Sequence, residues 1–498
     1  MYSLVIEGLS ECALYNRIEA PASITMKFLT CIINNGISIM LAITLIAWAM
    51  GTAGVGHAAE KSPPPNVVLI LIDDMGWTDL SSQGSNFYET PNIDQLAKSG
   101  VRFTTGYSAC TVCSPTRAAV LTGRYPARLH LTDWIAGHEQ PTAKLKIPNW
   151  TKQLVPEEVT LAEVFRDAGY TTGCFGKWHL GAKDHRPETQ GFQLNMGGTH
   201  VGQPPSYFFP YSSKNVKLPG LEEGERGEYL TDRLTSEVEK FITENKDRPF
   251  FAYVPHYTVH TPLQAKKPLI EKYAAKSKKG DDQANATYAA MIESLDESIG
   301  RITKKLAELK LTENTIVIFT SDNGGQLGNN ITSNKPLRAG KGSAYEGGVR
   351  VPLIVSWPHK ISANIVDVPA ISCDLFPTLL ELTEVENRSP NQIDGVSLAS
   401  LLLKQQPIHR DAIYWHYPHY HPGGATPYSA MRAGNYRLIE FFEDGRLELY
   451  DLAQDVGEQH DLAKMQPEKR NELHAKLLAW RKEMNAQLPE PNPNAASK

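Results

Sequence analysis

The stretch Asn66-Val-Val-Leu-Ile-Leu-Ile72, which runs directly into Asp73 and Asp74, decides the fold of this chain. Its unbroken apolar run predicts a strand that is buried on both faces, as in a parallel sheet covered by helices. Ligands of such sheets bind outside the carboxyl ends of the strands. We therefore expect the two carboxylates that follow this strand to belong to a functional site.

Strands and helices alternate beyond this stretch. Residues 160–169 predict a short helix, because they begin with a Thr-x-x-Glu capping box and end on a glycine. Further strands are expected over residues 170–175, 249–255 and 315–320. A longer helix precedes the last of these, with an apolar stripe of Met291, Leu295, Ile299, Ile302 and Leu306. The alternation favours an α/β fold in which helices flank a sheet.

The pattern changes after about residue 400. Strands over 436–442 and 447–450, joined by an Asp-Gly turn, predict an antiparallel hairpin in a smaller domain. A chain of 498 residues is also too long for one core. We divide it into an N-terminal extension with signal peptide (1–59), a large α/β catalytic domain (60–400), a smaller C-terminal α+β domain (401–488) and a disordered tail (489–498).

The N-terminus predicts export. An apolar run over residues 37–50 is followed by small residues up to 59, as at a signal-peptide cleavage site. We expect a periplasmic or secreted protein without a stable membrane span after cleavage, although a retained anchor, and a true start at Met26, stay open. The net charge of −5 does not favour nucleic acid as a partner. The few cysteines form no disulfide framework, and a bridge between Cys110 and Cys174 stays open.

Two acidic motifs predict a cation site. Asp73 and Asp74 cannot both stay charged beside each other at the end of a buried strand without compensation. Asp322 and Asn323 also follow a buried strand, so four oxygen-bearing side chains are expected to converge. Ligands of this kind suit a hard cation and disfavour zinc. Ca²⁺ is expected rather than Mg²⁺, because a crowded carboxylate site suits its higher coordination number.

The segment Cys113-Ser-Pro-Thr-Arg117, followed by Thr122-Gly-Arg124, resembles the signature of the type I, formylglycine-dependent sulfatases of the alkaline phosphatase superfamily. Segments similar to the other motifs of these arylsulfatase-like enzymes follow the same order, at 73–76, 176–181, 259–262, 321–325, 340–348 and 374–378. The resemblance covers most of the chain. It implies an alkaline phosphatase-like fold, with a large, mixed, mostly parallel sheet and a smaller C-terminal antiparallel sheet.

The resemblance also implies the chemistry. A maturation enzyme would oxidise Cys113 to formylglycine (3-oxoalanine), whose hydrate attacks the sulfur of a sulfate ester. The metal would be held by Asp73, Asp74, Asp322, Asn323 and an oxygen of modified Cys113. The other catalytic residues implied are Arg117, which holds the hydrate; Lys177, Lys341 and His260, which surround the sulfate; and His179, the base that restores the aldehyde. His260 or Lys341 would protonate the departing alcohol.

Substrate choice rests on less specific residues. An aromatic and histidine run at 415–421, with His416, His419 and His421, suits the face of a sugar, as does Trp134. A packed strand followed by a turn is the alternative. We expect an exported sulfatase acting on a sulfated polysaccharide or oligosaccharide. A phosphonate monoester or phosphodiester hydrolase and a noncatalytic sulfated-glycan-binding protein remain alternatives. The sugar, the sulfated position, exo or endo action and the oligomeric state are left undecided.

Overall fold

The computed structural model describes residues 63–277 and 282–496. The predicted signal peptide therefore lies outside the described residues. From Pro63 onward the chain forms one compact unit. Within the described ranges, no helix combines the length and the apolar character needed to cross a membrane.

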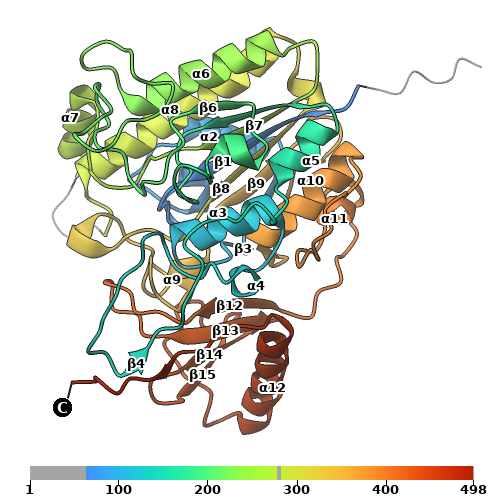
Figure 1. The fold of residues 1–498 in the computed structure, drawn as a ribbon. Helices are drawn as coiled ribbons and strands as arrows, with labels where there is room; N and C mark the ends of the chain where they lie inside the picture. Colours follow the sequence, from blue (N-terminus) through green and yellow to red (C-terminus); the bar gives the residue numbers. More distant parts are fainter. Residues whose placement is uncertain (1–62, 278–281, 497–498) are drawn as a thin grey trace, which may run out of the picture. The chain divides into compact units, whose positions relative to one another are not determined.

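An eight-stranded sheet in the order β10-β2-β9-β8-β1-β7-β5-β6 forms the centre of this unit (Figure 1). Its strand β1 (Asn66–Ile72) lies between β8 (Thr315–Ser321) and β7 (Phe250–Pro255), parallel to both, and all of its residues are buried. Strand β9 (Leu353–Ser356) runs antiparallel to its neighbours, which makes the sheet mixed. The remaining strands are β2 (Val101–Phe103), β5 (Thr171–Phe175), β6 (Leu194–Met196) and β10 (Asn364–Val366). The predicted mixed, mostly parallel sheet is confirmed.

Helices cover both faces of the sheet, as the continuous apolar run of β1 requires. Val68, Ile70 and Ile72 pack in one core with helices α2 (Pro91–Lys98), α6 (Leu230–Glu244) and α8 (Ala286–Glu308). The alternate residues Val67, Leu69 and Leu71 pack in a second core with α3 (Cys113–Thr122), α5 (Leu161–Asp167), α10 (Leu375–Thr383) and α11 (Ala399–Lys404). The expected α5 begins at the predicted capping box, in which Thr160 and Glu163 bond reciprocally.

A second, four-stranded antiparallel sheet follows in the C-terminal part. It consists of β12 (Ile413–Tyr417), β13 (Tyr428–Ala433), β14 (Tyr436–Phe441) and β15 (Leu447–Asp451), with α12 (Pro467–Glu483) packed against it. The predicted hairpin is β14 and β15. The predicted boundary at residue 400 is wrong, because it cuts α11, whose Leu401 and Leu402 pack in the core of the large sheet.

The predicted disorder of residues 489–498 is wrong for the part of the tail that the structure describes. Strand β16 (Glu490–Pro491) pairs with β4 (Leu145–Lys146). The side chain of Asn492 donates hydrogen bonds to the carbonyls of Pro141 and Ala143, at 2.9 and 2.7 Å. A Pro/Asn-rich segment cannot form a core by itself, but here a distant loop satisfies its backbone.

The smaller elements are α4 (Pro126–Leu129), α7 (Lys267–Lys276) and α9 (Glu346–Val349), and a two-stranded sheet of β3 (Gly106–Tyr107) and β11 (Ala370–Ile371). Among the described residues, Cys110 and Cys174 are buried and free, so they do not form the disulfide that the sequence left open.

Candidate active site

The two acidic motifs lie together at the carboxyl edge of the large sheet. The parallel register of β1 and β8 pairs Ile72 with Ser321, so the residues that follow each strand become neighbours. The backbone N–H of Asp74 donates to Asp322 Oδ1 at 3.2 Å, and Asn323 Nδ2 donates to Asp74 Oδ1 at 2.8 Å. The four predicted metal-binding side chains that follow these strands are therefore brought to one buried place.

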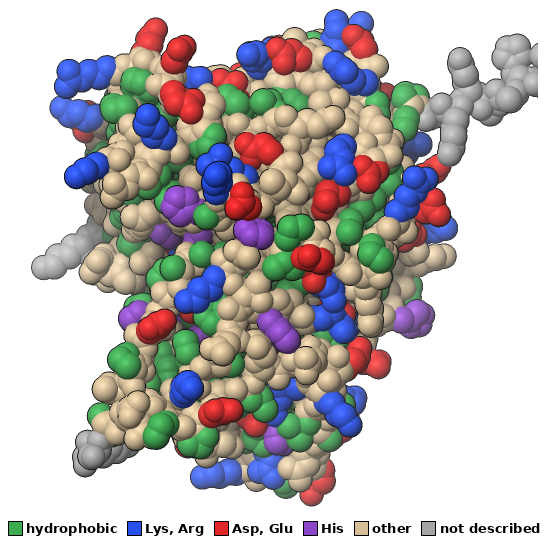
Figure 2. Space-filling model, in the orientation of Figure 1, with side chains coloured by type: hydrophobic (Ala, Val, Ile, Leu, Met, Phe, Trp, Pro, Cys, Tyr) green, Lys and Arg blue, Asp and Glu red, His purple; other side chains and the backbone are tan. Residues whose placement is uncertain are grey.

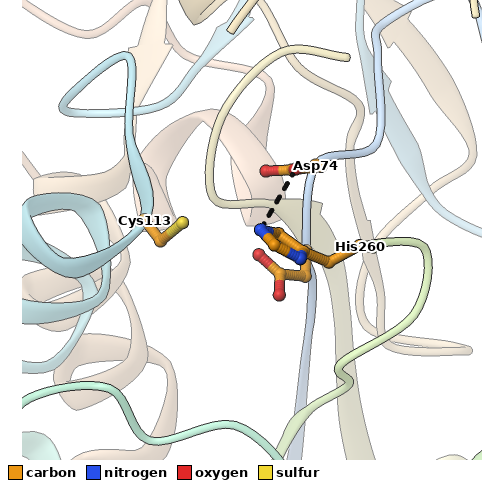
Figure 3. Close-up of side chains that lie close together, drawn as sticks. Asp74, Cys113 and His260 are labelled. Atoms are coloured by element: carbon orange, nitrogen blue, oxygen red, sulfur yellow. Dashed lines mark ion pairs between the residues drawn. The ribbon is translucent and has the colours of Figure 1, made fainter. Parts of the chain in front are cut away.

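Cys113 faces the same place from the first position of α3. Its side chain points toward Asp74 and His260 (Figure 3), and potential ligand atoms of Asp73, Asp74, Cys113 and His260 all lie within 4.8 Å of one another. All residues of α3 are buried, so the helix holds the thiol rigidly. Burial also raises the pKa of the Cys113 thiol to about 11, which makes the unmodified side chain a poor nucleophile.

Arg117 lies one helical turn beyond Cys113. Its Nε and Nη2 donate to Asp322 Oδ2 at 2.9 and 2.7 Å, and its Nη1 donates to the carbonyl of Lys177 at 2.8 Å. The arginine is fully buried, and the nearby Asp322 and Asp73 raise its pKa against the effect of burial. It therefore stays charged and fixes Asp322 relative to the start of α3.

Two lysines pair with the other carboxylates. Lys177 Nζ donates to both oxygens of Asp73, at 2.7 and 2.9 Å. Lys341 Nζ lies 2.7 and 2.8 Å from the two oxygens of Asp74. His260 Nε2 lies 3.6 Å from Asp74, while its Nδ1 donates to the carbonyl of Thr261. The site is thus a dense cluster of alternating charges.

Burial and the neighbouring charges compete in setting the pKa values of this cluster. It raises the pKa of Asp73 to about 8 against the attraction of Lys177, with the neighbouring carboxylates Asp322 and Asp74 adding to the increase. Asp74 behaves oppositely, since Lys341 and His260 outweigh burial and hold its pKa well below the usual range. Asp73 therefore lacks sufficient positive charge in its surroundings.

The side chains present fit a hard metal ion. Asn323 Oδ1 is buried and has no hydrogen-bond partner among the described residues, although its amide nitrogen makes two hydrogen bonds. A buried, unpaired carbonyl oxygen beside three carboxylates is costly without a ligand. A bound cation would satisfy this oxygen and supply the charge that Asp73 lacks.

His179 has the geometry of a base. Its Nε2 donates to the carbonyl of Ile135, which leaves Nδ1 as the unprotonated nitrogen of the neutral ring. Nδ1 is buried and has no partner among the described residues, and burial together with Lys177 lowers the pKa of His179. The backbone has a positive φ of 57° at this position, directly after the tryptophan of the Gly-Lys-Trp-His motif.

A cavity of about 670 Å³ opens over the cluster. Cys113, His179, His260 and Lys341 line its base, and Trp134 and His421 line its wall. Sequence reasoning missed further lining groups, among them Gln203 and Ile135, because both lie in loops without a recognisable motif. A cavity of this size suits a small organic ligand or one end of a larger one.

The imidazole ring of His421 occupies space that a side chain at Gly342 would fill. A Cβ built on Gly342 would lie only 1.9 Å from His421 Nδ1, and the positive φ of 77° also favours glycine there. The N–H of Gly423 donates to His421 Nδ1 at 2.9 Å. The neutral ring therefore carries its proton on Nε2, which makes His421 a hydrogen-bond donor beside Lys341.

The other two histidines of this run do not line the cavity, so their prediction as substrate contacts is wrong. His416 is buried on β12, between Ser429 Oγ and the carbonyl of Gln487, at 2.8 Å each. His419 is fully buried and bonds Thr132 Oγ1 at 2.8 Å. Contacts with distant segments bury both rings, His416 against β13 and the C-terminal segment and His419 against Trp150, which is the packed-strand alternative.

The sheet with its polar carboxyl edge and buried cluster defines a hydrolase of the alkaline phosphatase-like fold. A family model described as Sulfatase matches residues 65–385, and a second, described as N-sulphoglucosamine sulphohydrolase, C-terminal, matches residues 340–486. The chain therefore belongs to the sulfatase family and is a sulfuric ester hydrolase that acts on a sulfated substrate.

Individual relatives agree with the family. The chain is 33% identical over 503 residues to a sulfatase of Formosa agariphila, covering 86% of this chain and 90% of the relative. It is 35% identical over 392 residues to N-acetylgalactosamine-6-sulfatase of Canis lupus familiaris, covering 74% and 71%. The solved structure of Ps i-CgsB in complex with k-i-k-neocarrahexaose is similar with a TM-score of 0.71 and 29% identity, covering 87% and 95%.

Proposed function

We propose that this sulfatase removes sulfate from a carbohydrate, with Cys113 matured to formylglycine and a Ca²⁺ bound by Asp73, Asp74, Asp322 and Asn323. One observation carries the proposal: Cys113 faces a buried carboxylate cluster that contains an unpaired amide oxygen. A catalytic cysteine would need a lowered pKa, whereas burial raises the pKa of this thiol. The position suits an oxygen nucleophile made from the cysteine better than the thiol itself.

The matured residue would supply the attacking oxygen, and the cation would supply positive charge to it and to the sulfate. Side chains of the protein would neutralise charge and transfer protons. Lys341 lines the base of the cavity and would neutralise an anionic group there, the buried Lys177 is bonded to Asp73, and Arg117 holds Asp322 in place. Nδ1 of His179, the free acceptor, would take a proton during release of sulfate. Of the two predicted donors, Lys341 would give a proton to the departing alcohol, because burial lowers the pKa of His260 to about 3 and the single proton of its neutral ring is bonded to the carbonyl of Thr261.

Support for a carbohydrate comes from the cavity wall and from the relatives. Trp134 offers a flat ring, His421 offers an Nε2–H donor and Gln203 offers an amide. Such groups suit the hydroxyls and the apolar face of a sugar. The relatives named for N-acetylgalactosamine 6-sulfate and solved with a neocarrahexaose point to the same class of substrate.

We further propose that the protein is exported to the periplasm or beyond the cell, on the basis of the apolar run at 37–50 and the small residues after it. Fractionation of the native host, with N-terminal sequencing of the mature chain, tests this. A mature protein that begins at Met1 or Met26 and stays in the cytoplasm would contradict it.

A peptide mass measurement over Cys113, on protein purified from the native host, tests the central proposal. We expect the mass of the aldehyde in place of the thiol, and one Ca²⁺ per chain by elemental analysis. Turnover should be compared on 4-nitrophenyl sulfate, bis(4-nitrophenyl) phosphate and defined sulfated saccharides. Complete retention of the thiol in active enzyme, or a clear preference for the phosphodiester, would reject the proposal.

A further inference from the structure

A second cavity, which we call the distal cavity, lies beside the active-site cavity. It has a volume of about 530 Å³, and its lining includes Glu139, Lys146, Asn149, Trp150, Lys152 and Asn494. The loop over residues 139–152 supplies one side of it, and the C-terminal segment after β16 supplies the other. None of these residues belongs to the catalytic cluster.

The two cavities are lined by neighbouring segments of the chain. Ile135 lines the active-site cavity and Glu139 lines the distal cavity, so at most about 14 Å of extended chain separates them. On the opposite side, His421 follows Tyr420, whose hydroxyl accepts a hydrogen bond from the N–H of Leu145 at 3.1 Å. Lys146, next to Leu145 on β4, lines the distal cavity. A chain-like ligand that starts over Cys113 can therefore reach the distal cavity.

The chemistry of the distal cavity favours an anionic sugar. Lys146 and Lys152 are exposed and form no ion pair within the described part of the chain, whereas the neighbouring Lys144 lies 3.6 Å from Glu443. On the face that Figure 2 shows, Lys and Arg side chains are interspersed with Asp and Glu. Trp150 adds an aromatic ring, with Lys152 Nζ 5.4 Å from its centroid.

The distal cavity is also held in a fixed shape. Strands β4 and β16 pair across it, and the side chain of Asn492 ties the 139–152 loop at two carbonyls. Trp150 packs edge-on against the ring of His419, at 5.6 Å between centroids. Hydrogen bonds that order a polar surface loop reduce the entropy lost when a ligand binds.

We propose that the distal cavity binds a sulfate group on a neighbouring sugar of the same substrate, so that the enzyme prefers a sulfated oligosaccharide to a single sulfated sugar. This inference rests on the proposed carbohydrate function. Lys146 and Lys152 contact the distal sulfate, and Trp150 contacts the sugar that carries it. Glu139, the acidic residue of the lining, disfavours ligands whose negative charge fills the whole cavity.

The test uses the full-length matured enzyme and substrates that differ only in length. The substrates are a disaccharide and a hexasaccharide of chondroitin sulfate or of carrageenan, whichever the wild type desulfates, with 4-nitrophenyl sulfate as the small reference. We compare the wild type with the double variant Lys146→Glu/Lys152→Glu. The control Lys98→Glu/Lys404→Glu changes the net charge equally at exposed lysines that line neither cavity.

We expect the wild type to desulfate the hexasaccharide with a kcat/KM about tenfold above that of the disaccharide, and the double variant to lose this gain through KM. The double variant should keep its kcat/KM on 4-nitrophenyl sulfate within about twofold, like the control. Added salt should lower the length preference of the wild type and leave that of the double variant unchanged, because salt screens exposed charges.

If the wild type had the same kcat/KM on the disaccharide and on the hexasaccharide, the distal site would be rejected, but the proposed carbohydrate function would stand. An equal loss on all three substrates, or an unchanged hexasaccharide KM in the double variant, would overturn the distal site as well. Turnover of 4-nitrophenyl sulfate without desulfation of any saccharide would instead reject the proposed carbohydrate function.

Discussion

The base and the wall of the active-site cavity are built in different ways. At the base, Cys113 begins α3 and faces the carboxylates at the ends of β1 and β8, and these elements pack in the two main cores. The wall includes Trp134, in a loop that packs against the core of the C-terminal sheet, and His421, in the loop between β12 and β13. This difference indicates that rigid core elements determine which bond is broken, whereas loops determine which alcohol is released.

The largest effect is expected at the base. Cys113→Ala should lower kcat by at least about 1000-fold on every substrate, since it removes the precursor of the nucleophile. Steady-state rates on 4-nitrophenyl sulfate measure this. Cys110→Ala is the matched control, because Cys110 is equally buried and free but does not line the cavity. It should lower the melting temperature and retain kcat, and a comparable loss of kcat in both variants would contradict the assignment.

A smaller effect is expected when only the unpaired oxygen is removed. Asn323→Ala deletes the buried Oδ1 that has no partner, so the affinity for Ca²⁺ should fall at least about 10- to 100-fold. Titration of Ca²⁺ against the melting temperature of metal-stripped protein checks this, with the wild type as reference. An unchanged Ca²⁺ midpoint would place the ion elsewhere.

At the wall, the effect should appear in KM. His421→Ala removes the Nε2–H donor and should raise KM for a sulfated saccharide about tenfold. Gly342→Ala should do the same, because its Cβ would displace the imidazole. The double variant should be no worse than Gly342→Ala alone, since the clash disappears with the ring. Fully additive losses in a double-mutant cycle would show that Gly342 does not act through His421.

The smallest effect on turnover is expected behind the wall, where the change concerns stability. Burial raises the pKa of Asp133 to about 7, while hydrogen bonds from Tyr417 and Trp134 oppose the increase. Because the folded state then binds more protons than the unfolded state, this group makes the protein less stable as pH rises from about 4 to 7. Asp133→Asn keeps the acceptor for Tyr417 and removes the dependence.

We expect Asp133→Asn to gain about 3 kcal/mol in unfolding free energy relative to the wild type at pH 8 compared with pH 5, because pH 5 lies about two units below the folded pKa of about 7. Urea unfolding at the two pH values measures the difference. An equal change in both proteins would mean that Asp133 is ionised in the folded state throughout this range.

Much of the base could be predicted from local sequence. A continuous apolar run predicts a doubly buried strand, and in a parallel register two such strands end side by side, so Asp74 and Asn323 meet. The role of Cys113 was predicted only from the resemblance of its surrounding sequence to the family signature. The tail could not be predicted, since Asn492 finds its partners at Pro141 and Ala143, far away along the chain.

The sequence by itself determined the α/β fold, the acidic ends of the two central strands and the cysteine that faces them, because these depend on periodicity and on motifs a few residues long. Only the tertiary structure decided which histidines reach the cavity and how they are protonated. His416 and His419 turn into the interior, whereas the space left by Gly342 admits His421. The positions of these side chains depend on contacts between segments that are far apart in the chain, so local sequence patterns do not predict them.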